Sequence, residues 1–161
     1  MKKTNAFNVI DSILTNESET YLVDFVPFTF PNEDYFELEK FLQKSYKAKY
    51  AEKVVFIAFT LMYYYDCSVF LDNDVEESIF SDLLNKDLRK IGLNKLEDII
   101  KTIIIEDYSA LNIIMKHDDT YSLMRIEDGY QTLFFNISGK DLRIIKELVN
   151  HQGLFFKKVE W

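Results

Sequence analysis

The chain has 161 residues, of which 48% are hydrophobic and 16% are aromatic. This is enough apolar material for one packed core, so we expect a single globular domain over residues 1–161 and no disordered tract. The formal net charge is −8 at pH 7. A phosphate backbone would be repelled by such a surface, so the composition argues against nucleic-acid binding.

The excess of negative over positive charge is concentrated in the first half of the chain. Residues 1–80 contain 7 Lys/Arg and 14 Asp/Glu, a net charge of −7, whereas residues 81–161 contain 12 and 13, a net charge of −1. Opposite charge attracts a protein partner and steers its approach, so this asymmetry predicts a basic protein partner.

Several features indicate a cytoplasmic protein that does not enter a membrane. The single cysteine, Cys67, excludes an internal disulfide and a multi-cysteine zinc site, and it fits a reducing compartment. The N-terminal apolar residues are interrupted by Asn8, Asp11 and Ser12, unlike the apolar core of a signal peptide. The longest apolar run, residues 54–65, is shorter than the roughly 20 residues that a spanning helix needs.

The first half of the chain reads mainly as helix. Apolar spacing and turn residues predict, in chain order, a short helix ending near residue 16, a strand over 21–26, a helix over 33–50, a buried element over 51–65, a helix over 75–91 and a shorter helix over 96–103. The residues expected on the buried side of the 33–50 helix are Tyr35, Leu38, Leu42 and Tyr46.

The apolar pattern is ambiguous over residues 51–65 and clear over residues 75–91. Residues 51–65 could be strand or helix, because a wholly apolar run has no period, and Ala51 and Ala58 favour helix. The 75–91 helix has the clearest pattern in the sequence. Asp74 and Glu77 resemble a capping box at its start, and Gly92 would end it.

The second half changes to the two-residue period of strands. The expected elements are strands over 109–116, 120–127 and 130–137, a helix that begins after Ser138 and ends at Gly153, and a strand over 154–159. Asp128-Gly129 is a strong hairpin-turn signal. We therefore predict an α+β fold, in which a helical N-terminal half packs on a mainly antiparallel C-terminal sheet with β-β-β-α-β order from about residue 109.

Two aromatic pairs indicate how this sheet is covered. Phe134-Phe135 and Phe155-Phe156 must each expose one ring unless both faces of the sheet are covered, since neighbouring strand residues point to opposite faces. We expect the sheet to be covered on both faces.

His117, Asp118 and Asp119 form the most obvious candidate for a reactive cluster. Neighbouring residues in an extended segment point to opposite faces, so these three are poorly placed to chelate one ion. Asp is common in tight turns, and we interpret the segment as a hairpin turn. His151 would lie in the last turn of the C-terminal helix, where the helix dipole favours a positive charge.

The sequence therefore predicts no catalytic, metal or cofactor site. It contains no Gly-rich phosphate loop, nucleophile elbow or His-Glu-x-x-His motif. No cationic residue lies next to Cys67 in the sequence to activate the thiol. The main alternative is a small metal-dependent hydrolase, which would need His117, Asp118, Asp119 and His151 to meet in the fold.

These observations favour a non-enzymatic bacterial protein-binding domain, such as an immunity protein or inhibitor that neutralises a basic toxin. Tyrosine beside carboxylate is typical of binding hot spots, provided that the rings are exposed. The candidate partner-binding residues are Tyr63, Tyr64, Tyr65, Asp66, Asp72, Asp74, Glu76 and Glu77. A third possibility is a homo-oligomeric structural or adaptor protein joined through exposed apolar strand faces.

Overall fold

The computed structural model describes residues 3–16, 19–27, 36–72, 80–106 and 109–159. In these residues the fold is α+β, with five α-helices and six strands. The helices are α1 (Lys3–Thr15), α2 (Phe36–Ser45), α3 (Lys47–Tyr64), α4 (Leu93–Glu106) and α5 (Gly139–His151). The strands are β1 (Thr20–Asp24), β2 (Asp66–Leu71), β3 (Leu111–Lys116), β4 (Tyr121–Ile126), β5 (Thr132–Phe135) and β6 (Phe155–Lys158).

The six strands form one antiparallel sheet in the order β2-β3-β4-β5-β1-β6. The predicted β-β-β-α-β order of the second half is confirmed by β3, β4, β5, α5 and β6. The first half also contributes two strands, and only β1 was expected. β2 was missed because five of its six residues are buried, so the sequence lacks the alternation that marks a strand with one exposed face.

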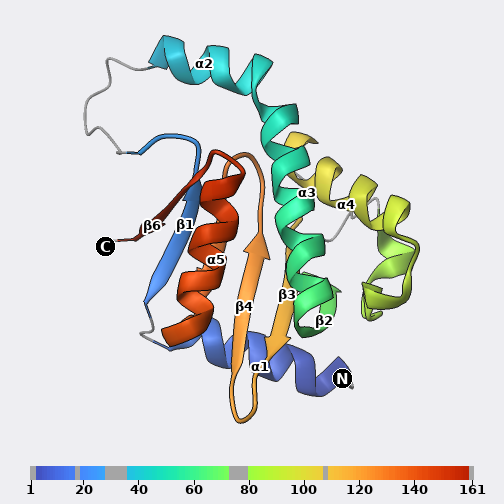
Figure 1. The fold of residues 1–161 in the computed structure, drawn as a ribbon. Coiled ribbons are helices and arrows are strands. Elements are labelled where there is room, and N and C mark those ends of the chain that lie inside the picture. Colours follow the sequence, from blue (N-terminus) through green and yellow to red (C-terminus); the bar gives the residue numbers. More distant parts are fainter. Residues whose placement is uncertain (1–2, 17–18, 28–35, 73–79, 107–108, 160–161) are drawn as a thin grey trace.

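Helices cover both faces of the sheet (Figure 1). The larger core lies between the sheet and α3, α4 and α5, and it includes Phe134. On the opposite face, Ile10 and Ile13 of α1 are buried together with Phe70 and Leu123, which lie on β2 and β4. Both faces are therefore covered over the central strands, as expected. At the edge strand β6 the expectation is wrong, because the Phe155 ring is 38% exposed.

The range predicted as one helix, residues 33–50, contains α2 and the first residues of α3. Its first residues, including Tyr35, lie outside the described part of the chain. α2 ends at Ser45 and α3 begins at Lys47, and α2 extends beyond the sheet (Figure 1). Leu38 is 46% exposed, so its predicted burial is wrong. Because α2 lies beyond the sheet, its apolar side chains have little to pack against.

The α-helix predicted over 75–91 does not form in its described part. Residues 80–91 contain two short 3₁₀ helices, Ser81–Leu83 and Leu88–Lys90, and both Asp74 and Glu77 lie outside the described residues. Asp87 accepts a hydrogen bond from the backbone N–H of Val69 on β2, at 3.0 Å. The segment therefore covers the edge of the sheet, where backbone N–H and C=O groups of the edge strand need hydrogen-bond partners. The contacts made there compete with the formation of a regular α-helix.

The two predicted hairpin turns are confirmed, whereas the roles predicted for Ser138 and Gly92 at helix ends are not. The His117 N–H donates to the Thr120 carbonyl at 2.9 Å, which closes the hairpin between β3 and β4. Gly129 has a φ of +62° in the turn between β4 and β5. Ser138 precedes α5, but its hydroxyl forms no capping hydrogen bond. Gly92 does not end a helix, because its carbonyl accepts from Leu96 at the start of α4.

Among the described helices, none combines the length and apolar character needed to cross a bilayer.

Candidate functional site

The outward side of α3 carries a row of exposed aromatic rings. Tyr63 is 92% exposed, and Tyr64 and Phe56 are each 53% exposed. Phe56 and Tyr63 are seven residues apart, so they lie on the same side of the helix two turns apart. We call Phe56, Tyr63 and Tyr64 the α3 surface. Asp66 follows closely in the sequence, but its side chain lies on the face of the sheet that α1 covers. The sequence did not predict Phe56, because the uniform apolar run hides which side of the helix is buried.

Packing on the other side of α3 explains this exposure. Val54, Ile57, Ala58 and Leu61 are 0–1% exposed against the sheet and the neighbouring helices. A helix repeats every 3.6 residues, so the opposite side must face outward. The chain then leaves the helix at Tyr65, which has extended backbone angles, and enters β2 at the exposed Asp66.

Tyr65 points inward, unlike its two neighbours. Its hydroxyl donates to Asp141 Oδ1 at 2.5 Å, and its ring lies edge-on to the His117 ring with 5.3 Å between centroids. Burial, followed by the hydrogen bond to Asp141, raises the pKa of Tyr65 above its ordinary value. Tyr65 therefore joins α3 to α5 rather than contributing a free ring to the surface.

Asp72 is also engaged within the protein. Its carboxylate lies 2.6 Å from Arg125 Nη2, and the Asp72 side chain is 23% exposed. Arg125 also contacts Glu127 and donates to Asn112 Oδ1 at 3.0 Å. Of the eight candidate residues, Tyr63, Tyr64 and Asp66 are exposed, Tyr65 and Asp72 are engaged internally, and Asp74, Glu76 and Glu77 lie outside the described residues.

The acidic excess of the first half is partly neutralised by the last strand. Lys158 of β6 pairs with Glu19, and Lys157 pairs with Asp24, which lies on the adjacent strand β1. The hydrogen bond from Lys158 lowers the pKa of Glu19 below its ordinary value. The negative charge available to a partner is therefore smaller around β1 than the sequence indicates.

His117 lies in a hydrogen-bonded cluster with Ser122 and Asp141. Its Nε2 is 2.6 Å from Ser122 Oγ, and its Nδ1 is 3.2 Å from Asp141 Oδ2. The order serine, histidine, aspartate is that of the nucleophile, the general base and the acid that orients the base in serine hydrolases. Ser122 is 0% exposed, however, so a substrate carbonyl has no route to its Oγ. The cluster joins the β3–β4 hairpin to the start of α5.

The four residues of the alternative metal site do not come together. His151 lies ten residues after Asp141 on α5, so the helix separates it by about 15 Å from the end that His117 contacts. Asp118 and Asp119 are exposed at the hairpin. Within the described residues, no group of three or more His, Cys, Asp or Glu side chains is placed to hold a metal ion.

No family model, curated protein or solved structure matches this chain. The geometry and charge of the α3 surface therefore carry the functional interpretation.

Proposed function

We propose that the protein is a non-enzymatic binding protein that docks a basic protein partner through the α3 surface, as an inhibitor or immunity protein docks a cationic toxin. The observation that carries this proposal is the exposure of Tyr63, at 92%, beside the exposed rings of Tyr64 and Phe56. Large apolar rings gathered at one place on a surface are a common mark of a protein interface.

The residue types of the α3 surface suit a protein partner. Aromatic side chains bury a large area and lose few rotamers on binding, so they dominate many interfaces. Exposed carboxylates precede and follow the rings in the sequence. Glu52 precedes Phe56 by one helical turn, and Asp66 follows Tyr64 by two residues, on the face of the sheet that α1 covers. A Lys or Arg from the partner can pair with these carboxylates and stack on the tyrosine rings.

The same geometry gives the metal-hydrolase alternative no support, because His117 and His151 lie at opposite ends of α5. The homo-oligomeric alternative would also use exposed apolar rings. The experiment below distinguishes it from the proposed function by the identity of the bound protein.

The test is affinity purification of the tagged protein from its native cells. The wild type is compared with a Tyr63→Ser/Tyr64→Ser variant and with a Leu38→Ser/Phe41→Ser control, which removes exposed apolar residues from α2 instead. We expect a stoichiometric basic protein with the wild type and the control, and its loss with the tyrosine variant. Recovery of no partner, or equal recovery with the tyrosine variant, would overturn the proposal. Recovery of the protein's own second copy alone would favour the homo-oligomer.

Association kinetics with the recovered partner test the role of charge. Asp66→Lys and Glu52→Lys should slow association and flatten its dependence on salt, because long-range attraction acts mainly on the association rate. Unchanged rates would remove these two carboxylates from the proposal.

A further inference from the structure

The helix α2 presents two large apolar side chains to solvent. Phe41 is 62% exposed and Leu38 is 46% exposed. They are three residues apart and Ser45 follows four residues later, so the three lie on one stripe of the helix. The Tyr130 hydroxyl donates to the Leu42 carbonyl at 2.8 Å, which ties α2 to the turn between β4 and β5. Because α2 extends beyond the sheet (Figure 1), its stripe is open to another molecule.

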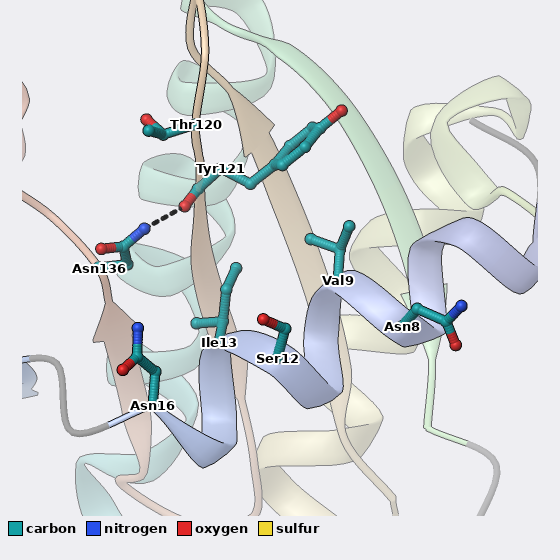
Figure 2. A pocket seen from close by; sticks show the side chains of 8 residues that line it. All are labelled: Asn8, Val9, Ser12, Ile13, Asn16, Thr120, Tyr121 and Asn136. Atoms are coloured by element: carbon teal, nitrogen blue, oxygen red, sulfur yellow. Dashed lines mark hydrogen bonds between the residues drawn. The ribbon is translucent and has the colours of Figure 1, made fainter.

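The helix α1 shows how an apolar stripe is buried elsewhere in this fold. Figure 2 shows Val9 and Ile13 of α1 pointing toward the sheet, beside a hollow of about 300 Å³. Ile13 is buried there together with residues of the strands. Such packing matters for a short helix, since an isolated helix of fewer than about 12–15 residues is marginal in water. α2 has only 10 residues, and among the described residues its stripe has no such cover.

Two charged residues lie along one side of this stripe. Glu37 precedes Phe41 by four residues and Lys44 follows it by three, so the two charges lie on the same side of α2, two turns apart. Both side chains are exposed, and within the described residues neither forms an ion pair. One helix thus carries a negative and a positive charge at equal distances, to within one residue, on either side of an exposed ring.

We propose that α2 binds the α2 helix of a second copy of this chain, in an antiparallel pair around a two-fold axis near Phe41. In such a pair residue i contacts residue j, and residue j contacts residue i. An axis at this place brings the two Phe41 rings together and sets Leu38 of each copy against the small Ser45 of the other.

The charges select this arrangement. The same axis places Glu37 of each copy beside Lys44 of the other, so two opposite-charge pairs form at once. A parallel pair would instead place like charges together. The pattern of α2 therefore complements itself, which favours a second copy over an unrelated protein as the occupant of the stripe.

The size of α2 limits the strength of this contact. A helix of ten residues is about 15 Å long. The pair then buries less than the roughly 1,200 Å² at which stable interfaces begin. We therefore expect a weak, concentration-dependent dimer with a Kd on the order of 0.1 mM.

The dimer leaves the α3 surface free. α2 precedes the N-terminal end of α3, whereas Tyr63 lies 16 residues after Lys47, about 24 Å along the helix axis. The Tyr63→Ser/Tyr64→Ser variant should therefore self-associate as the wild type does, and the two proposals fail separately. A dimer this weak dissociates during washing, so it does not affect the purification that tests the proposed function.

The test is sedimentation velocity of the full-length protein over about 5–500 µM. The charge variants are Glu37→Lys and Lys44→Glu, each of which would place like charges together in the antiparallel pair. Glu37→Lys replaces one negative charge by one positive charge, so the net charge changes from −8 to −6. General repulsion between copies then falls, yet the proposed pairing predicts weaker association.

We expect each charge variant alone to associate about tenfold more weakly than the wild type. An equal mixture of the two should associate as the wild type does, because the introduced lysine of one then faces the introduced glutamate of the other. Phe41→Ser, which leaves the charges in place, should abolish association.

Three results would overturn the inference. The first is a wild type that stays monomeric over the whole range, or a Phe41→Ser variant that associates as strongly as the wild type. The second is a mixture of the charge variants that associates no better than either alone. The third is loss of association in Tyr63→Ser/Tyr64→Ser, which would assign the contact between copies to the α3 surface.

Discussion

Two side chains, Cys67 and Tyr21, illustrate how the fold changes acid–base chemistry. Burial raises the pKa of the Cys67 thiol to about 12, from an ordinary value of 9.0, even though Arg89 acts in the opposite direction. The hydrogen bond to Glu19 raises the pKa of Tyr21 to about 12, from 10.0. In the unfolded chain both groups lose these surroundings and ionise at lower pH.

This difference predicts an alkaline loss of stability. Both groups hold their protons more tightly in the folded state, so their contribution is fully present below the unfolded pKa values. It is lost as the pH rises from about 9 toward 12. Urea unfolding at a series of pH values should show a falling free energy of unfolding in this window, with a shallower fall for Cys67→Ala. A constant free energy across the window would contradict the prediction.

The contacts of Arg125 allow a prediction of how much this side chain contributes to the free energy of unfolding. Arg125→Met keeps the apolar stem but removes the ion pair with Asp72 and the hydrogen bond to the amide oxygen of the fully buried Asn112. We expect a loss of about 1–3 kcal/mol in the free energy of unfolding, measured by urea denaturation. The control is Lys101→Met, which breaks the exposed pair with Glu97 and should cost at most about 0.5 kcal/mol. Equal losses in the two variants would argue against a special role for Arg125.

At the scale of elements, the segment 80–91 acts as a cover for the edge strand β2. Asp87 accepts hydrogen bonds from the Val69 N–H and from the Arg89 N–H, each at 3.0 Å. The Asp87 side chain thus caps the 3₁₀ helix and also accepts the hydrogen bond of a backbone N–H group at the edge of the sheet. An exposed edge donor would be free to pair with another chain.

Removing this cover should weaken the fold and promote aggregation. We expect Asp87→Ala to lower the free energy of unfolding by about 1–3 kcal/mol. Light scattering after partial unfolding should rise faster for this variant than for the wild type. Asp82→Ala, which changes an exposed acid in the same segment, should behave as the wild type does. Aggregation at the same rate in both variants would show that the edge is protected in another way.

At the scale of the molecule, one sheet connects the two hydrophobic cores. Phe70 of β2 packs against α1, whereas its neighbour Val69 packs in the core under α3. Two neighbouring residues of one strand therefore belong to different cores. We infer that the cores unfold together rather than as separate layers.

The prediction is a large loss of stability in a single transition. Phe70→Ala should lower the free energy of unfolding by about 3–5 kcal/mol, because Phe70 is 1% exposed and its removal leaves a cavity. Circular dichroism and tyrosine fluorescence should give the same midpoint. Phe56→Ala, which removes an exposed ring, should change stability by no more than about 0.5 kcal/mol. Two separate transitions in Phe70→Ala would show that α1 and its core unfold independently.

The candidate site was predictable only in part, for reasons visible in particular residues. Tyr63, Tyr64 and Tyr65 are adjacent in the sequence, yet the first two are exposed and the third bonds Asp141 from another helix. The sequence has no local signal for this contact between residues 76 positions apart. The pairing of Asp72 with Arg125 also joins distant parts of the chain, since residues 72 and 125 are 53 positions apart.

Local patterns by themselves determined the α+β class, the hairpins at residues 117–120 and 128–129, and the order of the last five elements. Each of these depends on turn residues and on apolar periods within a few positions. Tertiary structure decided the strand at 66–71, the loss of the 75–91 helix over its described residues, and which rings and carboxylates face outward. These outcomes depend on contacts between distant segments, whose burial and hydrogen bonds outweigh the weaker preferences of the local sequence.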